Sequence, residues 1–406
     1  MSIMNAISGL MASSNYIDVI SNNIANASTT GFKSSTISFC DIVEQSRMAK
    51  NFIGAGTARS NLVQNFNNGP LINTGRDLDI GINQEGFFRV VDSHGRAHYT
   101  RNGQFSLDKN KNIVNMQGLY LTGQNKDYAN SNKIHSMHLI PINLKKKFIL
   151  LAKPTTKINF SPVLNDTHID DQNDNTIIPY NTSFTIYDKY ANPQKIDIMF
   201  EKDKKESNTW KAYINSRNIN DNSLDHKIEE VFTMKFNDQG QLTSPSVFMI
   251  LKTSKNFLHQ SITLDLTGTV VKQDSKLFFD PLFQDGYSEG VLKTFDILDN
   301  GEIMGTYSNQ KIFPIGQIIL AKFINPVKLR PEGSNLWAST VEAGSENLGI
   351  AGSMGFGSLR SKNLESSNVD LNKELLNMII AQRNYQSNAQ VLKTEDKILN
   401  TLVNLR

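Results

Sequence analysis

Both ends of this chain carry a single narrow stripe of apolar residues at helical spacing, outside a long middle region of strand-like character. The N-terminal stripe repeats at intervals of three, four and seven residues and comprises Ile3, Ile7, Leu10, Ile17, Ile20 and Ile24. This period predicts an amphipathic helix over residues 3–26. A helix with one stripe cannot bury it alone, so it requires a partner.

The C-terminal end repeats the pattern over residues 368–405, which contain neither Gly nor Pro. Its register comprises Leu371, Leu375, Met378, Tyr385 and Leu392, with Gln382 as the polar interruption. Ser367 and Asp370 fit a capping box at the start of this helix. Burying one Ile or Leu is worth about 1.5–3 kcal/mol, and the simplest partner for each stripe is the other. We therefore expect one helical domain of the coiled-coil type, with part of the longer helix left for neighbouring subunits.

Between the two ends, the apolar period changes from that of a helix to that of strands separated by turn signals. Asn102–Gly103 is the strongest hairpin signal, and the polar stretch 161–183 is typical of a long loop. The predicted fold is mainly β with α-helical termini, with two β domains nested in the chain. The expected regions are an N-terminal helix (1–30), a connector (31–70), three β regions (71–144, 145–284 and 285–358) and a C-terminal helix (359–406).

Charge and composition exclude several classes of protein. The chain has 42 basic and 39 acidic residues, a balance that argues against a nucleic-acid partner. No apolar stretch approaches the ~20 residues of a membrane span, so membrane insertion is not expected. No Lys or Arg precedes Lys33, so a secretory signal is not expected either. Cys40 is the single cysteine and is expected to behave as a small hydrophobe.

The chain shows no pattern typical of catalysis or of cofactor binding. His94 and His98, and likewise His135 and His138, lie in strand-like segments and would not share a helical face. The acidic stretch around His168 lacks the Gly and Glu that a Ca²⁺ loop starting at Asp171 would require. No phosphate-binding loop or nucleophile elbow occurs. We therefore expect no enzyme activity, no catalytic or metal site, and no cofactor.

Four blocks of sequence, two of them on the terminal helices, occur together in one order. The first is "ISNNIANASTTGFKSS", which contains Asn22, Ala25, Asn26, Thr29, Gly31, Phe32 and Lys33. The others are "TGRDLDIGINQEGFF", "YTRNGQFSLD" and the C-terminal segment from "LESSNVDLNKELL" to the last residue. Together they resemble the signatures of the bacterial flagellar axial proteins, which build the rod, the hook and the hook-associated structures. The blocks cover roughly half of the chain, whereas the middle third resembles the family only loosely.

Within this family, the length, the inserted outer domain and the C-terminal block favour the hook branch. The alternatives are another axial protein, of the distal rod or of the hook–filament junction, or a β-rich surface adhesin. The resemblance implies a subunit of a flexible tubular polymer that joins rod to filament and transmits motor torque as a universal joint. It implies that region 145–284 is an outer β domain and that 71–144 and 285–358 are the two parts of an inner β domain. It also implies that the signature residues and the C-terminal stripe serve assembly.

The resemblance also implies partners and a location. The expected partners are further copies of this chain, the distal rod protein, the hook cap protein during assembly, the hook–filament junction protein and the flagellar type III export apparatus. The expected location is the flagellum outside the cell, continuous with the basal body and reached through the flagellar channel.

Two turns carry local expectations. Asn26 is expected to end the first helix in the left-handed conformation, and Gly31 allows positive φ without steric strain. Lys111 stands in a turn where the family often has Gly, so Asn110 or Asn112 is expected to supply the positive φ there.

Overall fold

A computed structural model describes residues 2–44, 53–125, 139–165, 180–188, 192–203, 206, 208–218, 228–244, 247–252, 260–272, 282–353 and 355–404. The chain forms two compact units. The first comprises Met1–Lys147, Thr294–Thr306 and Ile312–Arg406, and the second comprises Phe148–Lys293 and Tyr307–Lys311. His135, His138 and His168 lie outside the described residues.

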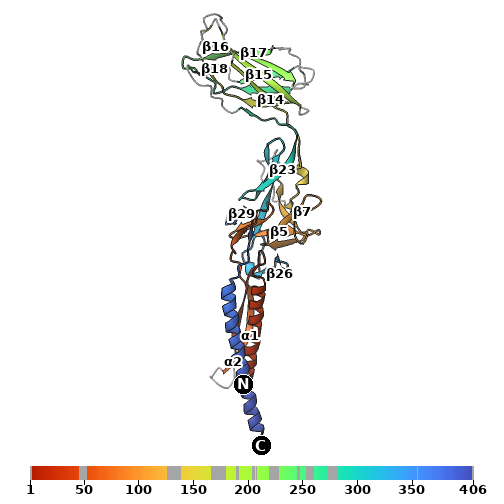
Figure 1. Cartoon of the computed structure of the whole chain (residues 1–406), viewed down its shortest axis with the longest axis vertical. Coiled ribbons are helices and arrows are strands. Elements are labelled where there is room, and N and C mark those ends of the chain that lie inside the picture. The colour runs from red at the N-terminus through yellow and green to blue at the C-terminus, as the bar shows by residue number, and fades with distance from the viewer. Residues whose placement is uncertain are drawn as a thin grey trace. The chain divides into compact units, whose positions relative to one another are not determined.

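The two terminal helices, α1 (Ser2–Ala25) and α2 (Leu371–Asn404), lie side by side in the first unit (Figure 1). Small side chains make their close approach possible: Ala6 and Ala381 are buried, and a Cβ on Gly9 would lie 2.8 Å from the Asn388 amide. Of the predicted N-terminal stripe, Ile20 is fully buried, but Ile7 is exposed. The helices therefore pair as expected, but through a seam of small residues.

The start of α2 differs from the predicted capping box. Asp370 Oδ1 accepts hydrogen bonds from the N–H groups of Asn372 and Lys373, at 3.0 and 3.2 Å. Asp370 is therefore the N-cap itself, whereas Ser367 lies outside the helix and accepts from Val369 N–H. The prediction of Ser367 as the cap is wrong by one helical turn, because Asn368 has other partners, described below.

A long antiparallel hairpin follows α1. It consists of β1 (Ser35–Glu44) and β2 (Ile53–Gln64) and packs along α1, where Tyr16 meets Phe39 edge to face. Sequence analysis assigned this stretch only as a connector. Cys40 lies on this hairpin and is exposed, so its expected role as a buried hydrophobe is wrong.

The rest of the first unit is β structure built from two distant parts of the chain. Its early strands are β3 (Leu71–Asn73), β4 (Ile80–Asn83), β5 (Phe87–Val91), β6 (Ala97–Thr100), β7 (Phe105–Leu107), β8 (Ile113–Asn115), β9 (Tyr120–Asn125) and β10 (Ile140–Pro141). Its late strands are β24 (Glu302–Tyr307), β25 (Ile312–Lys322), β26 (Arg330–Gly333), β27 (Leu336–Ala338), β28 (Asn347–Ile350), β29 (Ser358–Ser361) and β30 (Asn363–Glu365).

The early and late strands form one structure. The main sheet runs in the order β24-β25-β9-β5-β6-β27-β26, and two further ladders pair β4 with β29 and β3 with β30. An aromatic cluster that includes Phe87, Tyr99, Phe323 and Trp337 fills one part of the core. The two parts of the chain therefore share one core.

Asn102–Gly103 does not form the predicted hairpin. The flanking strands do not pair with one another: β6 pairs with β5 and β27, and β7 pairs with β8. A Cβ on Gly103 would lie 1.7 Å from the carbonyl oxygen of Ile80. The sequence signal misled because this position requires glycine for a close backbone approach and not for a turn.

The turn before β8 also differs from expectation. Lys111 itself has φ 62°, so neither Asn110 nor Asn112 takes the left-handed conformation. Asp108 Oδ1 accepts hydrogen bonds from the N–H groups of both asparagines, each at 2.8 Å. These bonds fix the two asparagines, and the residue between them adopts the positive φ.

The second unit contains two larger sheets around one core and a separate two-stranded sheet. Its strands are β11 (Ile149–Leu150), β12 (Lys157–Asn159), β13 (Val163–Asn165), β14 (Tyr180–Tyr187), β15 (Pro193–Lys202), β16 (Thr209–Asn218), β17 (Ile228–Phe236), β18 (Leu242–Ser244), β19 (Val247–Lys252), β20 (Gln260–Asp265), β21 (Val270–Lys272) and β22 (Phe283–Gln284). The chain then returns to the first unit through β23 (Gly290–Ile297).

The larger sheet of this unit runs β14-β15-β16-β17-β18, and the smaller one runs β19-β20-β12-β22. Their inner faces share a core in which Ile198 and Phe200 of the first sheet join Ile158 and Leu264 of the second. The predicted loop 161–183 is interrupted by β13 and by the start of β14, and its residues 166–179 lie outside the described part of the chain.

In the part of the chain that the structure describes, no helix combines the length and the hydrophobicity that a membrane span requires. Among the same residues, no group of three or more His, Cys, Asp or Glu side chains is placed to hold a metal ion.

Candidate functional site

The turn that follows α1 is stabilised by its own polar side chains. Asn26 Nδ2 donates to the carbonyl oxygen and to the side-chain oxygen of Asn22, both at 3.0 Å, and Thr29 Oγ1 donates to Asn26 Oδ1 at 3.1 Å. The backbone N–H of Asn26 still donates to Asn22 O, so Asn26 continues the helical path. It does not adopt positive φ, and that prediction is wrong.

Gly31 supplies the change of direction, with φ 71° as predicted. It is also the point of closest approach, since a Cβ there would lie 2.6 Å from Asn102 N. The N–H of Gly31 donates to the carbonyl oxygen of Glu365 at 2.8 Å. The turn after α1 thus contacts the segment that leads into α2.

Lys33 extends its ammonium group into the interior of the first unit. Its Nζ lies 2.7 Å from Glu365 Oε1 and donates to the carbonyl oxygen of Asn67 at 2.8 Å. Both charged side chains of this ion pair have no exposed surface. A lysine is rarely buried to this extent unless it is paired, so this signature residue has a structural role within the chain.

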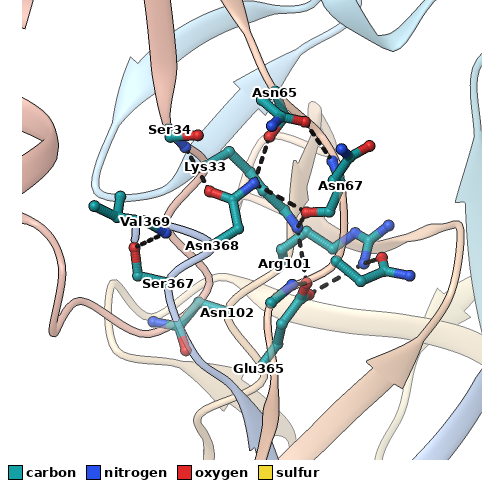
Figure 2. Close-up of polar contacts among 12 residues, drawn as sticks. Lys33, Ser34, Asn65, Asn67, Arg101, Asn102, Glu365, Ser367, Asn368 and Val369 are labelled. Atoms are coloured by element: carbon teal, nitrogen blue, oxygen red, sulfur yellow. Dashed lines mark hydrogen bonds and ion pairs between the residues drawn. The ribbon is translucent and has the colours of Figure 1, made fainter. Parts of the chain in front are cut away.

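Arg101 completes the site from a third part of the chain (Figure 2). Its NH1 donates to Glu365 Oε2 at 3.1 Å and to Asn68 Oδ1 at 3.2 Å, and its guanidinium lies over the ring of Phe87. The N–H of Gly69 donates to Glu365 Oε1 at 2.9 Å. One carboxylate therefore binds the segment after α1, the segment after β2 and the loop after β6. We call this set, Lys33, Asn67, Asn68, Gly69, Arg101 and Glu365, the joint.

The joint carries an excess of positive charge, because Glu365 accepts hydrogen bonds from both Lys33 and Arg101. Burial and, to a lesser extent, the nearby Arg101 guanidinium lower the pKa of Lys33 to about 8, against the attraction of Glu365. Burial also lowers the pKa of Arg101, against attraction from Glu365 and a smaller attraction from Glu85. Removing the shared carboxylate would leave two cations uncompensated in the interior.

Two asparagines connect the backbone around the joint. Asn368 Oδ1 accepts from Ser34 N–H at 2.8 Å, and its Nδ2 donates to the carbonyl oxygens of Asn65 and Asn67 at 2.8 and 3.0 Å (Figure 2). These bonds explain why Asn368 does not belong to α2. In α1, Asn23 binds both the N–H and the C=O of Ser35 in the same manner, at 2.9 and 2.8 Å.

The structure separates the predicted site residues into two groups. It brings Gly31 and Lys33 to the joint, with Asn26 and Thr29 in the turn above it and Phe32 half-buried beside it. Asn22 and Ala25 are exposed on the last turns of α1. On α2, Leu371, Leu375, Gln382 and Tyr385 are exposed, and Met378 and Leu392 are half-buried. The expectation that α1 covers the α2 stripe is therefore not met, and Leu375 is 50% exposed.

Sequence reasoning missed the residues that complete the joint: Glu365, Arg101, Asn23 and Asn368. Glu365 could have been considered as a site residue, since it lies at the start of the C-terminal signature block that begins with "LESSNVDLNKELL". Arg101 offered none, because its partners lie far from it in sequence. Asn23 and Asn368 lie within the signature blocks but were not singled out.

Profiles of four flagellar domain families match the chain. They are described as "Flagella basal body rod protein" (residues 3–33), "Flagellar hook protein FlgE/F/G D1 domain" (81–171), "Flagellar basal body protein FlaE D2 domain" (155–287) and "Flagellar basal body rod FlgEFG protein C-terminal" (360–405). The first and last of these profiles cover α1 with its turn and α2.

Full-length relatives give the same result. The chain is 40% identical to the flagellar hook protein FlgE of Salmonella typhimurium and 39% identical to that of Escherichia coli, with 100% of each chain covered. A crystal structure of the Helicobacter pylori flagellar hook protein FlgE2 matches its fold with a TM-score of 0.55 at 14% identity, covering 73% of this chain and 100% of that one.

Proposed function

The chain belongs to the flagellar hook protein family, and from this premise we propose how its parts serve a subunit of the hook. It is a structural protein of the flagellar hook, in the extracellular part of the flagellum. Hook subunits associate with copies of themselves, so the surfaces that matter are those which one copy leaves incomplete.

The observation that carries the proposal is the contrast between a buried joint and exposed apolar helices. Along α2, Leu371, Leu375, Leu376, Ile379 and Ile380 are all about half exposed or more. Burial of each such side chain is worth about 1.5–3 kcal/mol, and α1 does not supply that burial. We propose that helices of neighbouring copies cover these side chains in the polymer, in a coiled-coil-like inner layer.

The joint then sets the direction in which each helical pair leaves the β structure. Its contacts are short, buried and made entirely within one chain, so it would pass torque from the β structure to the inner layer. The second unit has a separate core and would form the outer part of the subunit, where polar and hydrated contacts permit sliding as the hook bends. The domain bounds 71–144, 145–284 and 285–358 expected above are retained as part of this proposal.

Further partners follow from the place of such a polymer. We propose that the chain contacts the distal rod protein at one end of the hook and the hook–filament junction protein at the other, and the hook cap protein during assembly. The polar segment after α1 is proposed to carry information read by the type III export apparatus.

The test is a charge placed in the exposed stripe. Leu375→Asp should abolish tube formation, because in the polymer a carboxylate would replace a buried apolar side chain, at a loss of several kcal/mol per subunit. Gln390→Asp is the matched control, since it adds the same residue at an exposed polar position of the same helix. Tube formation under kosmotropic salt is followed by electron microscopy, and the thermal stability of the monomer should be unchanged in both variants. Normal tubes from Leu375→Asp would contradict the proposal.

A further inference from the structure

The Asn68–Gly69 dipeptide has an unusual pair of contacts. Gly69 N–H donates to the buried carboxylate of Glu365 at 2.9 Å, and Asn68 Oδ1 accepts from the guanidinium of Arg101 at 3.2 Å. Asn68 is exposed, so water reaches its side-chain amide. The carboxylate of Glu365, a base, therefore contacts the backbone nitrogen of Gly69, and the cationic Arg101 contacts the side-chain oxygen of Asn68. In Asn–Gly sequences, this backbone nitrogen and this side-chain amide react with one another.

We propose that Asn68–Gly69 is a self-deamidation site, at which the joint converts the Asn68 amide into a carboxylate after the chain has folded. This inference does not depend on the proposed function in the hook.

The reaction balances with water as the only co-reactant. The backbone nitrogen of Gly69 attacks Cγ of Asn68, and the new C–N bond closes a five-membered succinimide. The side-chain nitrogen departs as ammonia and carries away the proton lost by Gly69. Water then opens the ring, which leaves Asp or isoAsp at position 68. No group is oxidised or reduced.

Each contact acts on one part of this reaction. Glu365 lies within hydrogen-bond distance of the proton that Gly69 must lose, which is the geometry of a general base. Arg101 donates to the oxygen on which negative charge develops during the attack, as a donor of an oxyanion hole does. Glycine at position 69 is required by the fold as well, since a Cβ there would lie 2.1 Å from the carbonyl oxygen of Ser366.

The product suits the site better than the starting amide. Lys33 and Arg101 together share a single carboxylate, that of Glu365. A carboxylate at position 68 would replace the Asn68 amide oxygen as a partner of Arg101 and would remove the excess positive charge. The joint would thus become more stable as the protein ages.

The chain contains two other Asn–Gly pairs, and they serve as internal controls. The side-chain oxygens of Asn102 and Asn300 accept from backbone N–H groups, at 3.1 and 3.0 Å. The N–H of Gly301 donates to the carbonyl oxygen of Leu298 and not to a carboxylate. Neither amide oxygen thus has the cation contact of Asn68, and Gly301 lacks the carboxylate contact of Gly69.

The experiment compares the three pairs in one sample. Purified full-length chain is incubated at neutral pH, folded or in urea, and digested. The conversion of amide to acid at each Asn is then followed by mass spectrometry. In the folded chain, Asn68 should convert about tenfold faster than Asn102 and Asn300, and in urea the three rates should become similar. A folded-state rate at Asn68 no higher than at the other two, or an advantage that persists in urea, would overturn the proposal.

Variants separate the chemistry from a general loosening of the fold. Glu365→Gln should remove the advantage of Asn68, while the rates at Asn102 and Asn300 report whether that variant remains folded. Asn68→Asp mimics the product and should raise the stability of the first unit above that of freshly prepared wild type, whereas Asn68→Gln, which retains an amide, should not. An Asn68→Asp variant that is less stable than Asn68→Gln would contradict the proposed role of the product.

Discussion

The joint and the paired helices belong to the same unit of the chain, but their burial is opposite to what residue type would suggest. In the joint a lysine, an arginine and a glutamate are buried, and the Lys33 ammonium and the Arg101 NH1 group both bind the carboxylate of Glu365, although Arg101 Nε has no hydrogen-bond partner among the described residues. Along α2, leucines and isoleucines remain exposed. The ion pairs of the joint are completed within the monomer, whereas the apolar side chains of α2 are not covered within it and, in the function proposed above, are covered by other copies.

Removing the shared carboxylate is the strongest way to test the completeness of the joint. Glu365→Gln leaves Lys33 and Arg101 without their common anion, and breaking a buried pair in this way costs about 3–5 kcal/mol. Unfolding of the first unit can be followed through Trp337 after Trp210→Phe, because the chain has two tryptophans. Glu342→Gln is the matched control at an exposed ion pair with Lys328, and it should change stability by less than about 1 kcal/mol. Equal effects of the two variants would remove the distinction between joint and surface.

The charge of Lys33 gives a second test, through pH. Its pKa is lowered from 10.5 to about 8 in the folded state. Between these values the unfolded chain binds the proton that the folded chain has lost, so stability should rise with pH in this window. Relative to Lys33→Met, the wild type should gain about 3 kcal/mol between pH 8 and pH 10.5 and nothing below the window. A constant difference between the two proteins across this range would show that the pKa of Lys33 is not lowered in the folded state.

Asn368 tests whether the backbone bonds around the joint matter as well as its charges. Asn368→Ala leaves the N–H of Ser34 and the carbonyl oxygen of Asn65 without their side-chain partner, at a cost of about 1–3 kcal/mol, whereas the carbonyl oxygen of Asn67 keeps the Lys33 ammonium. Asn372→Ala, at an exposed position of α2, is the control and should be close to neutral. Chemical denaturation monitored at Trp337 compares the two.

Limited proteolysis of the free monomer should distinguish α2 from the joint without any substitution that changes the stability of the protein. In the free monomer, trypsin should cleave first at exposed positions of α2 such as Lys393 and Lys397, because those turns have few apolar partners. The buried Lys33 and Arg101 should resist until the unit unfolds globally. Fragment masses over time give the order, and early cleavage after Lys33 would contradict a completed joint.

The terminal helices and the β regions are predictable from the sequence to a greater extent than the joint is. Helical period identifies α1 and α2 to within a few residues, because an apolar stripe is a local signal. The β regions are also predictable from strand period, whereas the division into an inner and an outer β domain was an implication of the family resemblance. Gly31 is predictable because the turn requires positive φ, which glycine adopts more readily than other residues.

The joint was not predictable, because it depends on partners brought together by the fold. Nothing near Lys33 in the sequence identifies Glu365 as its partner, and nothing near Arg101 identifies Lys33 or Glu365. Asn102–Gly103 shows the same limit, since one glycine signal serves both a hairpin and a close backbone approach. The exposed α2 stripe was misassigned because period reveals that an apolar face needs a partner but does not reveal which chain supplies it.

The distance along the chain between the two ends of the joint governs the order in which the subunit can fold. Lys33 and Glu365 are 332 residues apart, and closing a loop of that length costs about 5 kcal/mol of chain entropy. Contacts of this kind form late, after shorter loops within the two units have closed. A chain that ends before Glu365 can build separate sheets but cannot fix the direction of its first helix. The joint can therefore close only in a chain that extends through Glu365. A copy that ends earlier would enter an assembly without a fixed direction of its first helix.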